Sequence, residues 1–159
     1  MKQRSVHKPT EQKPTEKERF EKWLLDGKNP AERIRNLERA ARAPYDTDAK
    51  VSVLSKLPVL PRSQAAFLSM EALRDMALDG SEHAREAFEK AAEAWLNSHP
   101  RDGVDSQILS GIFLIIDAAS RLDSPRLKKI VEDAAIRCPV VRSQLYFWEH
   151  TLGMLPCVV

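Results

Sequence analysis

The sequence predicts an all-α protein, an antiparallel helical bundle preceded by a flexible N-terminal arm. Apolar residues recur three and four positions apart in successive segments, which places them on one face of a helix. Most of these segments begin at a residue that favours a helix start, such as serine, asparagine or proline. No segment of useful length alternates with the period of two typical of a strand, and only 5 of the 159 residues are glycine.

Residues 1–14 are predicted to be a disordered basic tail. They are rich in Lys, Gln, Pro and Thr and have almost no aliphatic side chains to bury. Residues 1–28 hold 8 Lys/Arg against 5 Asp/Glu, whereas residues 51–159 hold 12 against 14. This asymmetry is typical of a solvated tail, and it also suits an acidic partner such as nucleic acid.

Residues 15–42 are predicted to form two amphipathic helices. In the first, Thr15 and Glu18 have the spacing of a capping box, and Gly27 is a fitting end. The narrow apolar stripe of this helix consists of Phe20, Trp23 and Leu24. The second helix is expected to start at Asn29, with Pro30 at its first helical position, and to end before Pro44. Its basic face consists of Arg35, Arg39 and Arg42.

Neither of these two helices has a broad apolar surface of its own. A narrow stripe with aromatic and arginine anchors suits docking in the groove of another protein. We therefore expect residues 15–42 to be a partner-binding arm. The alternative is that both helices pack on the domain as a lid.

Residues 43–159 are predicted to be the helical domain. A short helix is expected over 48–56, followed by helices that start at Ser63 and Ser81 and are separated by Gly80. The first of these two is expected to bury Ala66, Phe67, Met70, Leu73, Met76 and Ala77. The second is expected to bury Ala84, Phe88, Ala91, Ala92, Trp95 and Leu96.

The segment after Asp105 contains the most apolar stretch of the chain and is expected to be the central helix. Apolar residues cover most of its circumference: Ile108, Leu109, Ile112, Phe113, Ile115 and Ile116. Asp117 follows, and we expect it to pair with Arg121, four residues further on. Two more helices are predicted, one opening at Ser124-Pro125 and one running from Pro139 to Leu152.

The connections between these helices are short, which favours antiparallel neighbours. The starts at Ser63 and Asp105 lie 42 residues apart, within the period of about 40–47 residues of HEAT-like repeats. Two such units are fewer than the roughly three that a repeat stack needs. A simple bundle and HEAT-like stacked helical hairpins therefore both remain open.

The helix after Ser81 carries an acidic stripe, which we expect to be a solvated face. Its members are Glu82, Glu86, Glu89 and Glu93. The alternative is a surface that receives a basic partner, including the basic face of residues 29–42.

No sequence pattern supports catalysis, a cofactor or a metal ion. The five glycines are isolated, so the phosphate-binding loop and the dinucleotide fingerprint are both missing. Neither His-Glu-x-x-His nor Cys-x-x-Cys occurs, and no activating motif accompanies Cys138 with His150. We predict a non-enzymatic protein without a cofactor, in which Cys138 is a packed cysteine.

Two functions fit these features. The first is a protein–protein interaction module: an adaptor, a chaperone-like protein or an assembly subunit. The alternative is a nucleic-acid-binding accessory protein that uses the basic arm and the arginine face, although a net charge of +2 is low for a dedicated binder. The chain has two cysteines, no signal-peptide pattern and no apolar run long enough to span a bilayer, so a cytoplasmic location is expected.

Overall fold

The computed structural model describes residues 13–25, 32, 35, 36, 39, 46–56, 63–98 and 106–152. Within these ranges the regular structure is helical and no strand occurs, which confirms the predicted all-α class. The elements are α1 (Glu16–Leu25), α3 (Thr47–Lys56), α4 (Gln64–Leu78), α5 (Glu82–Asn97), α6 (Ser106–Arg121), α7 (Pro125–Arg137), α8 (Pro139–Phe147) and the π-helical η1 (Trp148–Leu152).

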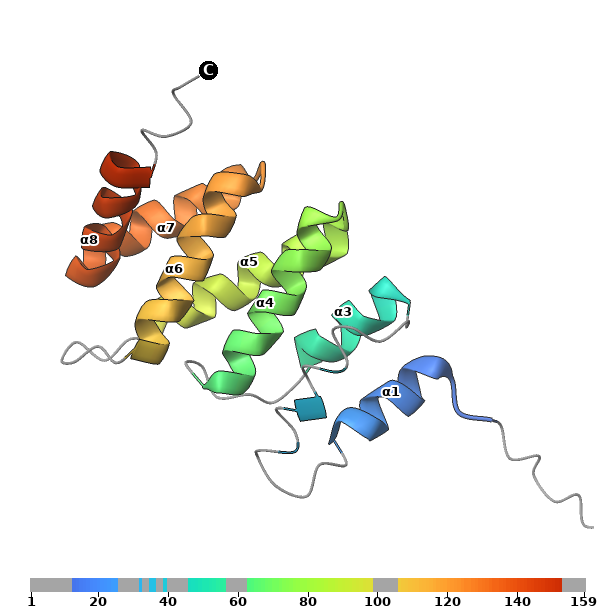
Figure 1. Ribbon diagram of the computed structural model, residues 1–159. Helices are drawn as coiled ribbons and strands as arrows, with labels where there is room; N and C mark the ends of the chain where they lie inside the picture. Colours follow the sequence, from blue (N-terminus) through green and yellow to red (C-terminus); the bar gives the residue numbers. More distant parts are fainter. Residues whose placement is uncertain are drawn as a thin grey trace, which may run out of the picture.

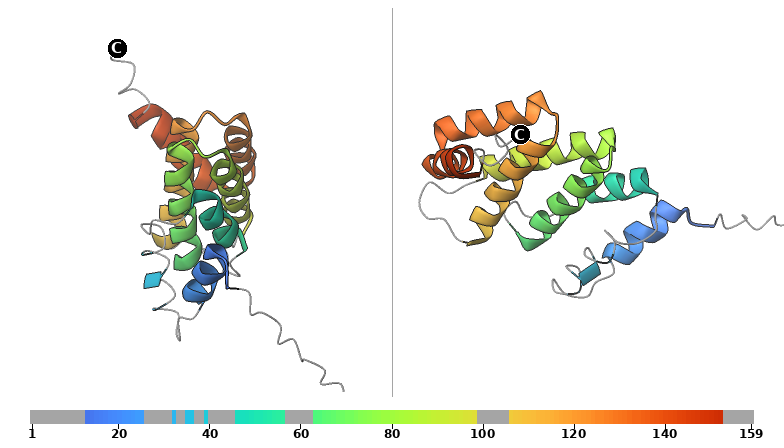
Figure 2. Two further views of the ribbon diagram at one scale, coloured as in Figure 1. Left: turned by 90° about the vertical axis from the view of Figure 1, so that its right-hand side faces the viewer. Right: turned by 45° about the horizontal axis from the view of Figure 1, so that its top comes forward.

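The helices lie in two layers (Figures 1 and 2). In one layer α3 contacts α5 and α5 contacts α7, while in the other α4 contacts α6 and α6 contacts α8. The two layers are joined chiefly by the packing of α4 against α5 and of α7 against α8. α1 packs on α3 at one end of the molecule, and α8 lies at the opposite end.

Hydrogen bonds confirm the predicted helix starts at Thr15, Ser63, Ser81 and Ser124, whereas those predicted at Asn29 and Asp105 lie outside the described residues. The hydroxyl oxygens of Ser63, Ser81 and Ser124 each accept a bond of 3.1 Å from the backbone N–H three residues later. In α1 the capping box is complete, because the Glu18 N–H donates to Thr15 Oγ1 at 3.2 Å and the Thr15 N–H donates to Glu18 Oε2 at 3.1 Å. These bonds satisfy backbone donors that a helix start leaves without an internal partner.

α6 supplies a long row of core residues, as predicted for a central helix: Ile108, Gly111, Ile112, Leu114, Ile115, Ile116, Ala118 and Ala119. The prediction is wrong for two of its apolar residues, since Leu109 is 37% exposed and Phe113 is 43% exposed. Helices α4, α5, α7 and α8 pack against the other sides of α6, but as a member of an outer layer it keeps one face toward solvent.

Two other predicted elements differ from the structure or lie outside it. The helix predicted from Pro139 to Leu152 is α-helical only to Phe147, and π-helical turns follow. A wider turn changes the direction in which the following side chains leave the helix. Most of the helix predicted over 29–42 falls outside the described residues, although residues 32, 35, 36 and 39 are helical.

Candidate functional site

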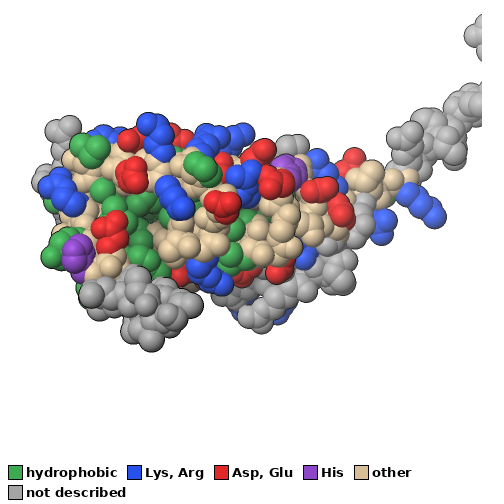
Figure 3. All heavy atoms as spheres, turned by 90° about the horizontal axis from the view of Figure 1, so that it is seen from above, with side chains coloured by type: hydrophobic (Ala, Val, Ile, Leu, Met, Phe, Trp, Pro, Cys, Tyr) green, Lys and Arg blue, Asp and Glu red, His purple; other side chains and the backbone are tan. Residues whose placement is uncertain are grey.

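Exposed large apolar side chains are concentrated at one end of the molecule. Among the described residues, all of them belong to α6, α7 or α8: Leu109, Phe113, Ile136, Tyr146 and Phe147. Figure 3 shows hydrophobic side chains gathered at this end, on the left of the view. Patches of this kind on a folded protein commonly mark interaction surfaces.

A groove of ≈ 510 Å³ lies beside these side chains, between α4 and α6 and next to α8. Its apolar lining consists of Phe67, Leu109, Phe113 and Leu114. Its polar lining consists of Glu71, Arg74, Ser110, Asp117 and Gln144. The groove therefore combines an apolar floor with side chains that can form hydrogen bonds.

Aromatic contacts hold the walls of the groove in place. The ring of Phe113 meets Trp148 edge to face, with centroids 5.3 Å apart at 72°. Across the groove, Phe67 packs at a tilt on the buried Trp95, with centroids 6.4 Å apart. Such pairs are favourable beyond the area that they bury, so the groove is formed before any partner binds.

Charges of both signs surround the groove. Arg74 pairs with Asp75 at 3.0 Å, and Arg121 pairs with Asp117 at 3.3 Å, which confirms the predicted i,i+4 pair. On the face drawn in Figure 3, basic and acidic side chains are intermixed. Mixed charge of this kind favours a particular orientation of a protein partner rather than general attraction of a polyanion.

The residues predicted to bind a partner lie elsewhere, on the segment 15–42. Phe20 is fully buried and α1 packs on α3, so Phe20 is not an accessible anchor in this structure. The arm and the lid both stay predictions for residues 15–42. The side chains of Trp23 and Leu24 are outside the described part. Arg35 and Arg39 are exposed and helical, and Arg42 is outside the described residues.

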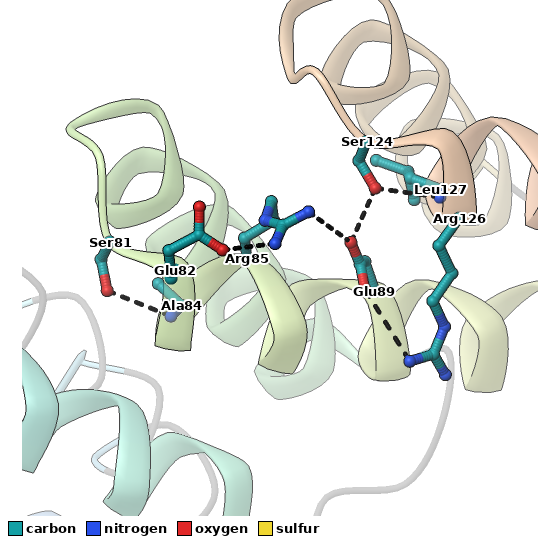
Figure 4. A network of polar contacts seen from close by, with 8 residues as sticks. All are labelled: Ser81, Glu82, Ala84, Arg85, Glu89, Ser124, Arg126 and Leu127. Atoms are coloured by element: carbon teal, nitrogen blue, oxygen red, sulfur yellow. Dashed lines mark hydrogen bonds and ion pairs between the residues drawn. The ribbon is translucent and has the colours of Figure 1, made fainter.

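The predicted solvated stripe on α5 is wrong for one member, because Glu89 is only 3% exposed. Figure 4 shows its partners. The Ser124 hydroxyl donates to Glu89 Oε1 at 2.6 Å, and the guanidinium groups of Arg85 and Arg126 lie 3.6 and 3.9 Å from the carboxylate. A carboxylate leaves water at low cost only with such partners.

This network joins α5 to the start of α7. Ser124 Oγ accepts the N-cap bond from Leu127 while its hydrogen is donated to Glu89. Arg85 also donates to Glu82, and this bond together with the negative charge of Glu82 raises the pKa of Arg85 above its usual value. The network therefore fixes the packing of α5 against the start of α7.

The described residues hold no group of three or more His, Cys, Asp or Glu side chains able to bind a metal ion. Cys138 is a free thiol at the junction of α7 and α8. The His150 ring stacks on Tyr146, with centroids 3.9 Å apart, and its Nδ1 lies 3.0 Å from the Tyr146 carbonyl oxygen. None of the helices in the described ranges has the length and apolar character that crossing a membrane requires.

Comparison of the chain with protein-family models, with curated proteins and with solved structures finds no match. The function is therefore inferred from the geometry and chemistry of the surface.

One signal for the exposed aromatic residues is present in the sequence. Tyr146, Phe147 and Trp148 are consecutive, and successive side chains on a helix point in directions about 100° apart. Three adjacent aromatic rings cannot all face one core, so at least one must lie at the surface. The sequence also indicates the exposure of Leu109 and Phe113. Apolar residues cover most of the circumference of α6, and a single core contact cannot bury all of them.

Proposed function

We propose that this protein is a non-enzymatic protein–protein interaction module that binds a partner segment in the groove between α4, α6 and α8. The observation that carries the proposal is Phe113, which lines the groove and remains 43% exposed although Trp148 holds its ring in place. A rigid, exposed aromatic ring in a groove is the usual form of an interface anchor.

The groove favours an amphipathic helix as the partner segment. Leu109 and Phe113 are four residues apart on α6 and so lie one above the other on a single helix face. A partner helix with apolar residues at matching spacing can place them against this pair and against Phe67. Arg74, Asp117 and the other polar groups at the groove would then set its direction.

We also propose that the domain is a stack of helical hairpins of the HEAT-like kind rather than a simple bundle. The alternation of successive helices between two layers, from α3 to α8, supports this arrangement. Stacked helical hairpins expose extended surfaces on each layer, and these surfaces bind other proteins. An adaptor or assembly subunit is the role that such a surface suits.

The nucleic-acid alternative stays a prediction. It depends on Arg35, Arg39 and Arg42, of which the first two are exposed. Its test is binding to a nucleic acid at low salt, where phosphate contacts are strongest.

The proposed function is tested by Leu109→Glu and Phe113→Glu in the tagged full chain, purified from its native cells after nuclease treatment. We expect partner proteins that co-purify with the unchanged chain to be reduced by about 30-fold or more, the loss typical of an interface anchor. Ser120→Glu is the matched control, because Ser120 is exposed on the same helix and does not line the groove.

Circular dichroism and thermal unfolding must show that each variant is folded. A folded Phe113→Glu variant that keeps every partner would refute the groove as the binding surface. Loss of all partners on nuclease treatment of the unchanged chain would favour the nucleic-acid alternative instead.

A further inference from the structure

A second hollow lies between α3, α4 and α5, away from the groove of the proposed function. Its volume is ≈ 460 Å³, within the range of roughly 300–1,000 Å³ of small-molecule sites. Its large apolar walls come from three helices and consist of Leu54, Met70, Leu73 and Trp95. Alanines of α5, among them Ala91 and Ala94, leave the space open.

One buried polar side chain that lines this cavity lacks a partner. Ser69 Oγ is inaccessible to solvent and has no hydrogen-bond partner in the described part of the chain. Trp95 Nε1 also lacks a described partner, but it lies against Gly111 of α6 and not toward the cavity. Arg85 Nε is the one other described side-chain atom of this kind, and Arg85 does not line the cavity. Buried polar atoms are nearly always hydrogen-bonded, so each exception requires an explanation.

Ser69 differs from other helical serines of the same chain. The Ser55 hydroxyl donates to the Val51 carbonyl oxygen at 2.7 Å, and the Ser110 hydroxyl donates to the Ser106 carbonyl oxygen at 2.8 Å. Such a bond to the preceding turn is the ordinary way for a helical serine to satisfy its hydroxyl group. Ser69 makes no such bond to a described residue, so its hydroxyl group can turn about the Cα–Cβ bond toward a molecule in the cavity without breaking a described hydrogen bond.

Trp95 makes the cavity rigid. Its indole ring is packed so closely on α6 that a Cβ atom at Gly111 would lie 2.0 Å from Cε2. Phe67 packs against the same ring. The large wall of the cavity is therefore fixed in position, as in ligand sites that exist before binding.

Three further polar side chains lie on one side of the cavity. His83, Glu86 and Lys90 line it from α5, and all three are exposed. His83 Nδ1 lies 3.4 Å from Asp48 Oδ1 on α3. Because the buried lining carries no charged group, the deep part of the site suits a neutral molecule.

We propose that this cavity binds a small, neutral, largely apolar molecule with a carbonyl oxygen that accepts a hydrogen bond from Ser69. The apolar body would lie against Met70, Leu73 and Trp95. This site shares no lining residue with the groove, although Phe67 of the groove packs on Trp95 of the cavity.

The probes are acetophenone and ethylbenzene, which have similar size and shape but differ in the carbonyl oxygen. Their dissociation constants for the full chain are measured by nuclear magnetic resonance titration. We expect acetophenone to bind about fivefold more tightly, the equivalent of one neutral hydrogen bond. Ser69→Ala should remove this preference and leave ethylbenzene affinity unchanged.

Two variants test the location of the site. Ala91→Leu and Ala94→Leu add bulk to the cavity lining, so each should lower the affinity for both probes about tenfold or more. Because Ala94 is exposed, we expect the Ala94→Leu variant to fold. Leu109→Glu, in the groove, should leave both affinities unchanged. The proposal is overturned if acetophenone does not bind, if the two probes bind equally well, or if folded Ser69→Ala or Ala94→Leu behaves like the unchanged chain.

Discussion

Ser124 uses one hydroxyl group for two bonds. It caps α7 in the same way that Ser63 and Ser81 cap α4 and α5, with the same distance of 3.1 Å. It differs from them in also donating to the buried Glu89. This single residue therefore couples the start of one helix to the packing of another.

We predict that Ser124→Ala destabilises the fold more than the other cap substitutions do. Loss of an N-cap costs about 1 kcal/mol, which is the change expected for Ser63→Ala and Ser81→Ala. Ser124→Ala also removes a hydrogen bond from a buried carboxylate, which adds roughly 1–3 kcal/mol. Urea unfolding of the three variants measures the difference, and three equal values would contradict the coupling.

A double-substitution cycle separates the two contributions. If Glu89 and Ser124 act together, the loss in Ser124→Ala should be smaller in a chain that already carries Glu89→Leu. Independent, additive losses would show that the 2.6 Å contact does not contribute to stability.

Among the helices, α6 has an unusual point of contact at Gly111. A glycine inside a helix usually costs about 1 kcal/mol relative to alanine. At Gly111 the missing side chain makes room for the indole ring of Trp95. The close approach of α5 and α6 therefore depends on this position.

We predict that Gly111→Ala destabilises the protein, which is the opposite of the helix-propensity effect. Its Cβ would collide with ring atoms of Trp95 that belong to the rigid core, and overpacking of this kind costs about 1–3 kcal/mol. Thermal unfolding with Trp fluorescence measures the change. Ser110→Ala, at the exposed neighbouring position, is the control and should change little. A more stable Gly111→Ala would mean that the helices separate at low cost.

The helices were largely predictable from local patterns. The Thr15–Glu18 capping box and the caps at Ser63 and Ser81 each depend on residues three positions apart, and all of them form. The burial of Glu89 was not predictable, because its partner Ser124 is 35 residues away. The groove likewise depends on how α4, α6 and α8 lie side by side, which no local pattern specifies.

For the whole molecule, α1 is the element for which the sequence left two alternatives, a partner-binding arm and a lid. A partner-binding arm would leave Phe20 accessible, but the structure buries it with Val51 and Val53 in the shared core. Burial of one large aromatic side chain contributes about 1.5–3 kcal/mol, which helps to hold a short helix on a domain. The narrow stripe of α1 thus reflects a small contact with its own chain.

We predict that Phe20→Ala lowers the free energy of unfolding by about 3–5 kcal/mol, the usual loss for a buried phenylalanine. Lys22→Ala, at an exposed position of the same helix, should change it by less than about 0.5 kcal/mol. Equilibrium unfolding in urea measures both. Unchanged stability in Phe20→Ala would return α1 to the role of a partner-binding arm.

The two ends of the molecule are chemically unlike. α1, at one end, exposes Glu18, Arg19 and Lys22, whereas α8, at the other, exposes Tyr146 and Phe147. Head-to-tail polymerisation requires the two ends of a subunit to be complementary. Contact between the charged side chains of α1 and the aromatic side chains of α8 in a second copy would remove water from the charges, and only a cation over an aromatic face offsets part of that loss. We therefore expect the aromatic side chains of α8 to bind an apolar surface of another protein more strongly than they bind α1 of a second copy.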